Sequence, residues 1–541
     1  MYSPLVRFSV LIMALAACSH APPPTSTVRQ QGSRRDPATA IGAAELRRDL
    51  FVFADDSFHG RRTGTPDAQR AAAFLARRVQ LLGLEPVGDS LYLQRVPLVR
   101  EVLARTTRLA VISSGGREQL LSVPQDVTPQ LGFSEGQPHP NRTAEGEIVF
   151  VGYGPTDDAS QAAMARLDLA GKVVVAVHGV PKKKSREDHA PILSSHEALN
   201  EEFARLLAFR PAAIITLMTD DLRSTYEGTA AMLLHRIVSD RPEAPVDSTR
   251  QIPLVLIGQA RRGSPLLPRD WPNDNTPQAL GRRLEANVDV ERQPFTGYNV
   301  VALVRGSDPK LNRTYLAFGA NYDGWGITPA LRGPSRRQAV DSIENGANNN
   351  GSGSVALLAI ARQTTYWRPK RSVLFVWHVA HDQGSLGARY FTAHPPFPID
   401  SIVAEFNLEG VAGTVSDGLA MVGPRAAPNY LSWRVGMIVD SVNFASATPL
   451  RIEREWDDPE APRVYEHGDH LSYAEHRIPT LFFASQCESK TSGLYDEPRL
   501  IDYDRLARVS QLLLESGLAV ANRSTRPTSE AITQSISSRQ E

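Results

Sequence analysis

The strongest constraint on the fold is an alternation of short apolar segments with helical segments in the C-terminal half of the chain. The apolar segments have the length and character of buried strands. Strands that alternate with helices predict an α/β fold with a mostly parallel central sheet flanked by helices. The expected strands are 300–304, 315–318, 373–377, 402–406 and 480–483, and the expected helices are 355–362, 386–392 and 505–519.

The chain is too long for this series alone. Its 541 residues predict two or three domains at about 150 residues each. Between residues 125 and 285 the pattern changes, and short apolar segments are separated by polar or helical stretches at 148–151, 173–177, 214–217 and 254–257. We interpret residues 125–285 as an inserted smaller α/β domain. The large domain is then split into residues 45–124 and 286–520, and the polar tail 521–541 is expected to be disordered.

The first residues have the pattern of an export signal. The apolar run 8–17 is too short to span a bilayer, and Cys18 follows Leu-Ala-Ala as in bacterial lipoproteins. We expect residues 1–17 to be removed, Cys18 to be lipidated, and residues 18–44 to form a disordered tether. An ordinary signal peptide with a chance cysteine is the alternative. Ser19 does not resemble an inner-membrane retention signal, which favours the bacterial outer membrane, facing the periplasm.

Charge and cysteine content exclude two further classes of protein. The chain has 59 basic and 59 acidic residues, so it lacks the positive charge expected of a nucleic-acid binder. Its two cysteines, Cys18 and Cys487, cannot build a disulfide scaffold. Membrane contact is therefore expected only through Cys18, with Cys487 left as a lone thiol.

Two histidine clusters raise the question of a metal. His378 and the pair His381-Asp382 follow the strand expected at 373–377, and imidazole and carboxylate are ligands that zinc prefers. However, a spacing of three residues at a strand end does not assure a shared face. The cluster at 467–470 (His-Gly-Asp-His) is similar and is more typical of a hydrogen-bonded turn. Neither cluster alone predicts a metal site.

Ser352 is the candidate for a nucleophile. It lies in the run 348–353 (Asn-Asn-Asn-Gly-Ser-Gly), which is typical of a turn that enters a helix. No Gly-x-Ser-x-Gly elbow surrounds it. The sequence therefore favours a helix cap over a nucleophile at this position.

Taken in order, these segments resemble metallopeptidase family 28, the co-catalytic zinc aminopeptidases, which also includes glutamate carboxypeptidase-like proteins. The resemblance covers about residues 45–520. It implies a zinc-exopeptidase-like fold and identifies the insert as similar to a protease-associated domain. The motifs that carry it are 319–323 (GANYD), 345–353 (NGANNNGSG), 380–390 (AHDQGSLGARY), 407–409 (NLE) and 468–470 (GDH).

The same resemblance implies that the family's metal ligands are replaced. Family members bind two zinc ions through His, a bridging Asp, Glu, Asp and a final His, and another Glu serves as general base. Asp323, which in the family orients the first ligand, is retained. The five ligand positions correspond here to Asn321, Asn349, Asp382, Glu409 and Ser492, and the base position to His381.

These replacements predict a weakened or absent metal site. Amide oxygens are poor zinc donors, and an asparagine cannot bridge two metals because its side-chain nitrogen is a donor. Without a metal to lower its pKa, water is a very weak nucleophile, although His381 could still act as a base. We therefore expect a non-catalytic or strongly impaired protein without a cofactor, which binds a peptide or protein ligand at the cell envelope.

Two other functions stay open at this point. A rebuilt site could support metal-dependent hydrolysis, either with Ca²⁺ or Mg²⁺ on Asp382, Glu409 and amide oxygens, or with zinc that recruits His381, His467 or His470. Alternatively, the inserted domain carries the function and the large domain supports it, although no motif indicates this. Fold alone does not decide among the three.

Overall fold

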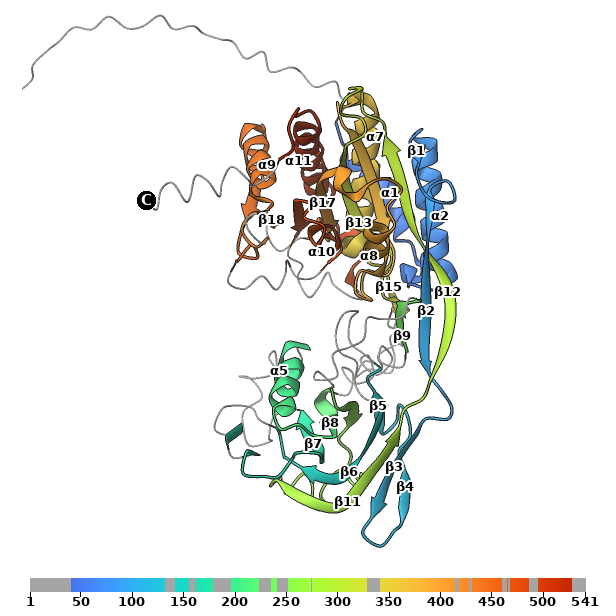
Figure 1. Cartoon of the computed structure of the whole chain (residues 1–541), viewed down its shortest axis with the longest axis vertical. Helices are drawn as coiled ribbons and strands as arrows, with labels where there is room; N and C mark the ends of the chain where they lie inside the picture. Colours follow the sequence, from blue (N-terminus) through green and yellow to red (C-terminus); the bar gives the residue numbers. More distant parts are fainter. Residues whose placement is uncertain are drawn as a thin grey trace, which may run out of the picture. The chain divides into compact units, whose positions relative to one another are not determined.

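A computed structural model of the chain places the predicted α/β series at the centre of a ten-stranded sheet (Figure 1). The structure describes residues 40–131, 142–154, 161–162, 164–178, 196–222, 235–240, 252–273, 275–327, 341–413, 418–427, 431–459, 465, 468–485 and 495–527. Within these, the strand order is β19-β18-β20-β17-β13-β16-β12-β2-β9, and β1 also pairs with β12. The strands are β1 Glu85–Pro86, β2 Leu93–Leu103, β9 His235–Ser239, β12 Val290–Val304, β13 Tyr315–Asn321, β16 Ser372–His378, β17 Ile402–Glu409, β18 Gly418–Val422, β19 Arg451–Glu453 and β20 Thr480–Ala484.

The centre of this sheet is parallel. Strand β13 pairs in parallel with β16 on one side and with β17 on the other, and β17 pairs in parallel with β20. Toward the edges, β12 runs antiparallel to β16 and β2, and β18 runs antiparallel to β20. The predicted α/β fold with a parallel central sheet is thus confirmed, and antiparallel strands extend it on both sides.

Both faces of the central strands are covered by helices, as predicted. Leu316 and Phe318 of β13 belong to a large hydrophobic core with residues of α1, α2, α7, α9 and α11. Tyr315 and Ala317, on the opposite face of β13, belong to a smaller core with residues of α8 and α10. The helices are α1 Ala43–Phe53, α2 Pro66–Leu81, α7 Gly353–Trp367, α8 Leu386–Ala393, α9 Trp433–Ala445, α10 His470–Ala474 and α11 Tyr503–Ala521.

Strand β12 is much longer than the segment 300–304 predicted from the sequence. Its first half has a run of polar residues and is largely exposed, so it lacks the apolar run that marked the buried half. This first half pairs with β2, which the sequence pattern did not indicate. Residue-by-residue pairing from Val290 with Leu103 to Val300 with Leu93 joins the two parts of the large domain.

A second sheet occupies most of the predicted insert. Its order is β4-β3-β11-β6-β7-β8-β10-β5, and helix α5 (His196–Leu207) packs on one face through Phe203, Leu206 and Leu207. The sheet starts at β3, before residue 125, while β9 leaves it to pair with β2 of the large sheet. Its resemblance to a protease-associated domain stays a prediction. The strands are β3 Arg108–Ser113, β4 Glu118–Leu120, β5 Val127–Pro129, β6 Thr143–Phe150, β7 Val173–His178, β8 Ala213–Met218, β10 Leu254–Gln259 and β11 Gln278–Asn287.

The folded unit begins slightly before the predicted end of the tether. Ile41 is already buried, and residues from Ile41 onward form one compact unit. In the part of the chain that the structure describes, no helix has the length and apolar character needed to cross a membrane. The predicted signal peptide, Cys18, Cys487, Ser492, His467 and the tail beyond residue 527 lie outside the described residues.

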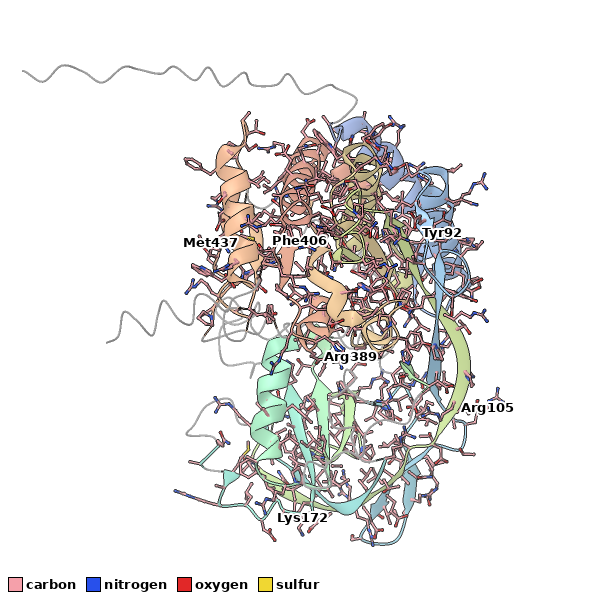
Figure 2. All side chains as sticks on the ribbon, turned by 45° about the horizontal axis from the view of Figure 1, so that its top comes forward. Tyr92, Arg105, Lys172, Arg389, Phe406 and Met437 are labelled. Carbon is pink, nitrogen blue, oxygen red and sulfur yellow. The ribbon has the colours of Figure 1, made fainter. Side chains whose placement is uncertain are left out.

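Phe406 lies at the centre of the large core and provides a test of it (Figure 2). Its ring packs edge-on against Phe318, with ring centroids 5.3 Å apart, and against Phe483 at 5.6 Å. We expect Phe406→Ala to lower the free energy of unfolding by about 3–5 kcal/mol, because it removes buried area and leaves a cavity. Urea unfolding followed by fluorescence measures this change. Phe444→Ala, at a side chain that is 90% exposed, is the matched control, and equal losses in both variants would contradict the assigned core.

Candidate functional site

The parallel register brings three candidate residues to one edge of the large sheet. Asn321 ends β13 and is paired in register with His378, which ends β16. Glu409 ends β17, next to β13 in the sheet. Because parallel strands share the direction of their carboxyl ends, these residues meet at the edge where functional sites of α/β sheets are expected.

Glycine is needed at position 319 for this strand arrangement. A Cβ atom there would lie 2.7 Å from Glu405 Oε1 and 3.1 Å from His378 Cε1. Such distances are shorter than van der Waals contact, so any larger residue would push β13 away from the buried side chains. The Gly of the GANYD segment is therefore explained by packing beneath the site.

The asparagine run serves as a hydrogen-bonded support. The Asn348 side-chain oxygen accepts the N–H of Ala412 at 2.8 Å, and the Asn350 side-chain oxygen accepts the N–H of Gly410 at 3.1 Å. Ser352 donates to the carbonyl of Asn348 at 2.7 Å and accepts the N–H of Val411 at 3.0 Å. All three side chains are buried and tie the start of α7 to the turn after β17.

The expected cap at Ser352 is wrong. Its hydroxyl makes no capping bond to α7, because it is used by Asn348 and Val411 instead. It is also fully buried, which removes it as a nucleophile for an outside substrate. The sequence pattern identified the turn correctly and assigned the hydroxyl to the wrong partner.

Asn321 and Asn349, which the resemblance aligns with ligand positions, differ in their surroundings. The side-chain oxygen of Asn321 accepts a hydrogen bond from the amide of Asn350 at 2.8 Å, and its nitrogen donates to the carbonyl of Asp323 at 3.3 Å. The Asn349 side chain is exposed, while its backbone N–H donates to Asp496. Both polar atoms of the Asn321 side chain therefore form hydrogen bonds within the protein, and its oxygen already accepts one.

His381 lies between two carboxylates. Its Nε2 is 3.3 Å from Glu409 Oε2, and its Nδ1 is 3.3 Å from Asp469 Oδ2. Burial alone lowers the pKa of His381, but the two carboxylates outweigh burial and raise this pKa well above its usual value. His381 is therefore an imidazolium cation at neutral pH, held between Glu409 and Asp469.

Asp469 connects this cation to a second histidine. Its carboxylate is buried and also lies 3.5 Å from His378 Nδ1, while His378 Nε2 is 2.9 Å from the Tyr473 hydroxyl. Burial raises the pKa of Asp469, but the charges of His381 and His378 outweigh it and hold the pKa far below its usual value. Asp469 thus stays ionised although it is buried.

Two further carboxyl groups lie near this cluster. Asp323 is buried and accepts the N–H of Ala380 at 2.6 Å and the hydroxyl of Thr63, and burial raises its pKa. Solvent reaches the Asp382 side chain, yet protein surrounds its carboxyl on most sides. The desolvation outweighs the attraction of His381 and raises the pKa of Asp382 to about 7.

Sequence reasoning missed Glu405, which lies beneath the site on β17. It is fully buried, and neither carboxylate oxygen makes a hydrogen bond of normal geometry within the described residues. Burial raises the pKa of the Glu405 carboxyl well above its usual value. A single glutamate inside the apolar strand 402–406 was the available signal for an unusual buried acid.

Arg61 and Asp496 were also missed, and they hold the asparagine loop. Arg61 is fully buried and donates to the carbonyls of Asn345 at 2.7 Å and Gly346 at 2.9 Å. Asp496 accepts the backbone N–H groups of Asn348 at 2.6 Å and Asn349 at 2.8 Å. Arg61 and Asp496 lie far from this loop in the sequence, so no local sequence pattern indicates these contacts.

The residues present do not fit the family's zinc site. Among the residues that the structure describes, no group of three or more His, Cys, Asp or Glu side chains is arranged to hold a metal ion. His470 Nε2 donates to the carbonyl of Tyr465 at 2.8 Å, while its Nδ1 makes no hydrogen bond of normal geometry within the described residues. Burial also lowers the pKa of His470 to about 4. The local donor set therefore consists of amides, an imidazolium and separate carboxylates.

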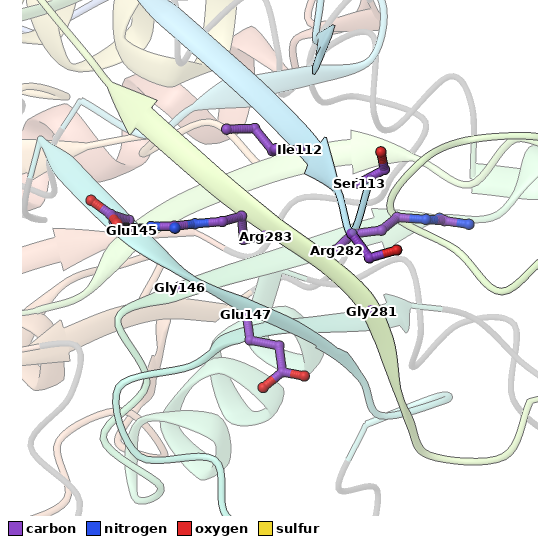
Figure 3. Close-up of a pocket in the computed structure, with 9 residues that line it drawn as sticks. Ile112, Ser113, Glu145, Gly146, Glu147, Gly281, Arg282 and Arg283 are labelled. Atoms are coloured by element: carbon purple, nitrogen blue, oxygen red, sulfur yellow. Dashed lines mark ion pairs between the residues drawn. The ribbon is translucent and has the colours of Figure 1, made fainter. Parts of the chain in front are cut away.

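A cavity of about 450 Å³ lies elsewhere, on the second sheet (Figure 3). It is formed where the pairing of β11 with β6 shifts register between Ala279 and Arg283. Arg283 and Glu145 form an ion pair beside it, visible in the close-up. None of the candidate site residues lines this cavity, so it does not belong to the site at the sheet edge. Its lining residues are Ile112, Ser113, Ser114, Glu145, Gly146, Glu147, Gly281, Arg282 and Arg283.

Asp496 makes stability depend on pH in a defined direction. Burial outweighs its hydrogen bonds and raises its pKa from 3.8 to about 6. The folded state therefore binds the proton more tightly, and this contribution to stability is complete below about pH 4 and lost as pH rises through 6. Relative to Asp496→Asn, the wild-type free energy of unfolding should fall by roughly 3 kcal/mol from pH 4 to pH 7.

Chemical denaturation at several pH values measures this difference. Asp504→Asn, at an exposed position at the start of α11, controls for the change of charge alone. A wild-type-minus-variant difference that is constant with pH would contradict the buried, proton-binding state of Asp496.

Comparison with known proteins finds a family model that matches part of the chain. Residues 299–516 match the model of peptidase family M28. A probable leucine aminopeptidase 2 of Aspergillus oryzae is 31% identical over 109 residues, which are 20% of this chain and 18% of the relative. Leucine aminopeptidase 2 of Trichophyton equinum is 25% identical over 132 residues, 22% of this chain and 26% of the relative. The chain thus matches about a fifth to a quarter of the length of these relatives.

The likeness to solved structures covers far more of the chain. An aminopeptidase from Aneurinibacillus sp. strain AM-1 is 16% identical with a TM-score of 0.51, over 91% of this chain and 96% of that chain. A zinc aminopeptidase from Bacillus subtilis is 15% identical with a TM-score of 0.50, over 90% of this chain and 97% of that chain. The family match over residues 299–516 and these likenesses show that the chain has the metallopeptidase fold of peptidase family M28.

Proposed function

We propose that this chain is a lipid-anchored protein of the cell envelope that uses an M28 aminopeptidase fold to bind a peptide or protein, with little or no peptidase activity. The observation that carries the proposal is the position of His381 between Glu409 and Asp469, 3.3 Å from each. A positive side chain of the protein thus lies against the carboxylate that corresponds to a zinc ligand in the resemblance.

The geometry around His381 supports this proposal independently of any titration. A neutral imidazole has one N–H and one lone pair. With a carboxylate facing each ring nitrogen, a neutral ring would direct its lone pair at a negative oxygen, so both nitrogens need to carry protons. A protonated nitrogen cannot bind a metal. A cation on Glu409 would therefore have to displace His381 or be repelled by it.

The amide positions support the same conclusion. The side-chain oxygen of Asn321 accepts the Asn350 amide at 2.8 Å, so binding a metal there would cost a buried hydrogen bond. A neutral amide at Asn349 also supplies none of the negative charge with which a bridging carboxylate offsets two dications. Together these changes remove the donors that would activate water, while the scaffold around Asn348, Asn350 and Ser352 remains hydrogen-bonded.

The cleft keeps groups that could bind a ligand. Solvent reaches the Asp382 side chain and the Glu409 side chain, which is 22% exposed, although protein surrounds most of the Asp382 carboxyl. The solved structures of similar fold are aminopeptidases, whose substrates are peptides. This favours a peptide or protein ligand over a nucleic acid. The lipid anchor at Cys18 and the outer-membrane location, facing the periplasm, are proposed from the sequence pattern alone.

The alternative is a metal-dependent hydrolase with a rebuilt site. A similar solved structure is a zinc aminopeptidase, and several buried polar atoms at this edge of the sheet make no hydrogen bond of normal geometry within the described residues. Such atoms could receive an ion or water. They are Asp323 Oδ1, His378 Nδ1, His381 Nδ1, Asn407 Nδ2, both oxygens of Asp469 and His470 Nδ1.

Metal analysis and peptidase assays on the purified chain distinguish these functions. We expect far less than one zinc ion per chain after dialysis against buffer containing zinc, and no metal-dependent turnover on a panel of aminopeptidase substrates. Stoichiometric, tightly held zinc together with turnover would contradict the binding function. Under the alternative, His381→Ala would abolish that turnover.

Restoring the donors provides the matched comparison. A variant with Asn321→His, Asn349→Asp, His381→Glu, Asp382→Glu and Glu409→Asp has the same scaffold with the family's residues at five positions. It should hold more zinc than the wild type, because imidazole and carboxylates replace amides and an imidazolium. The midpoint of thermal unfolding without metal confirms that the variant folds. Equal zinc in both proteins would contradict the assigned loss of donors.

A further inference from the structure

The edge of the large sheet opposite the candidate site is built from three loops that are bonded to one another. The N–H groups of Ser307 and Asp308 donate to the carbonyls of Pro369 at 2.9 Å and Lys370 at 3.2 Å. The N–H of Arg371 donates to the carbonyl of Ala521 at 3.0 Å. We call the surface formed by residues 305–314, 366–371 and 522–526 the amino edge, because β13 and β16 begin there.

The amino edge carries an excess of exposed cations. Its acidic residues are Asp308 and, beside it, Asp400, whose carbonyl accepts a bond from Arg526. Arg305 is the exception among the cations, because it pairs with Glu85 at 2.6 Å. The exposed basic residues are Arg305, Lys310, Arg313, Arg368, Lys370, Arg523 and Arg526. Seven exposed cations outnumber the three nearby carboxylates, which are Asp308, Asp400 and Glu85, so this surface is positive.

The cations crowd one another at its centre. Arg371 is buried and donates to Thr314 and to the carbonyl of Ser524, at 3.2 Å in the latter case. Burial lowers its pKa, and the nearby charge of Arg526 lowers it further. A surface on which like charges meet in this way favours an anionic partner.

Two aromatic side chains stand beside these cations. Tyr366 is 62% exposed and Trp367 is 50% exposed, at the end of α7. Large aromatic side chains usually lose most of their exposure on folding, and Tyr and Trp rings are enriched where an apolar phase meets water. Exposed aromatics next to Arg and Lys therefore fit the interface of a lipid bilayer.

The chain enters the folded unit near this surface. Glu45, in the first turn of α1, pairs with Arg362 of α7 at 2.5 Å. Arg362 precedes Trp367 by about 7.5 Å along the helix. A flexible chain of the length from Cys18 to the folded unit would have an average span of about 25 Å. It also carries Arg29, Arg34 and Arg35. A lipid anchored at Cys18 is thus within reach of the amino edge.

We propose that the amino edge rests on the anionic headgroups of the bilayer that holds the lipid at Cys18. This rests on the lipid anchor in the proposed function. Lys370, Arg523 and their neighbours contact phosphate groups, and Trp367 lies at the headgroup level. The tether holds the protein at the membrane, and the amino edge orients it. The candidate site, at the opposite ends of the same strands, then faces away from the bilayer toward a ligand in solution.

Vesicle sedimentation tests this surface without the lipid anchor. The chain from Ser19 onward keeps the whole compact unit, which begins at Ile41. It should bind vesicles of phosphatidylethanolamine with phosphatidylglycerol at low salt, and lose binding at high salt. Replacing Trp367→Ser, Lys370→Glu and Arg523→Glu should weaken the partition about ten-fold or more, since each basic residue contributes several-fold.

The control variant has a charge change of the same size and also loses one exposed apolar side chain, but on another surface of the protein. It combines Leu81→Ser, Arg77→Glu and Arg105→Glu, at exposed positions on α2 and after β2. This variant should stay within about two-fold of the unchanged chain. Equal loss in both variants, absence of binding to the anionic vesicles, or equal binding to vesicles of phosphatidylethanolamine with phosphatidylcholine would overturn the proposal. The melting temperature of each variant shows that it is folded.

The anchor is tested separately. Mass spectrometry of the mature full chain from membranes should show an acylated Cys18 at the N-terminus. An unmodified Cys18 would contradict the anchor even if the amino edge binds vesicles, while an acylated Cys18 without vesicle binding would contradict the amino edge alone.

Discussion

The buried carboxylate of Asp469, placed between His378 and His381, is the interaction on which the candidate site depends. A buried charge is costly unless a group of opposite charge lies beside it. Here His381 supplies the positive charge and shares it with Glu409, so strands β16 and β17 and the start of α10 are held together by residues of the chain itself. In a metal centre the same carboxylates would need an added cation. This protein provides one within its own sequence.

The scaffold and the chemistry of the fold are separable in this chain. Asn348, Asn350 and Ser352 bind the turn after β17, and Asp496 and Arg61 hold the loop from the other side. These contacts require only hydrogen-bonding groups of the right shape, which amides and hydroxyls supply. Metal binding requires negative charge and free lone pairs at the same place. Asn348, Asn350 and Ser352 therefore support the scaffold without supplying carboxylate donors.

Local patterns in the sequence predicted the buried elements well. Strands such as β13 and β16 are apolar throughout and covered on both faces, so their composition alone marks them. The exposed half of β12 was missed because an antiparallel strand with one solvated side has no apolar run. A strand was predicted where its burial produces a run of consecutive apolar residues, and it was missed where no such run is present.

The site was predictable only in part. Resemblance placed Asn321, Asp323, Asp382 and Glu409 at one edge, and the strand register agrees for Asn321 and Glu409. The contact of His381 with Asp469 joins segments far apart in sequence, and no periodicity reports such a pair. The same holds for Asp496 and the asparagine loop. Glu405 alone left a local signal, as a carboxyl group inside an apolar strand.

A crystal structure of the full chain grown with zinc tests the position of His381 most directly, with diffraction data collected at the zinc absorption edge. We expect His381 to lie between Glu409 and Asp469, and we expect no anomalous peak within bonding distance of Asp382 or Glu409. An anomalous peak coordinated by these carboxylates, with His381 displaced or bound to it, would contradict the central claim that the chain's own imidazolium replaces the metal.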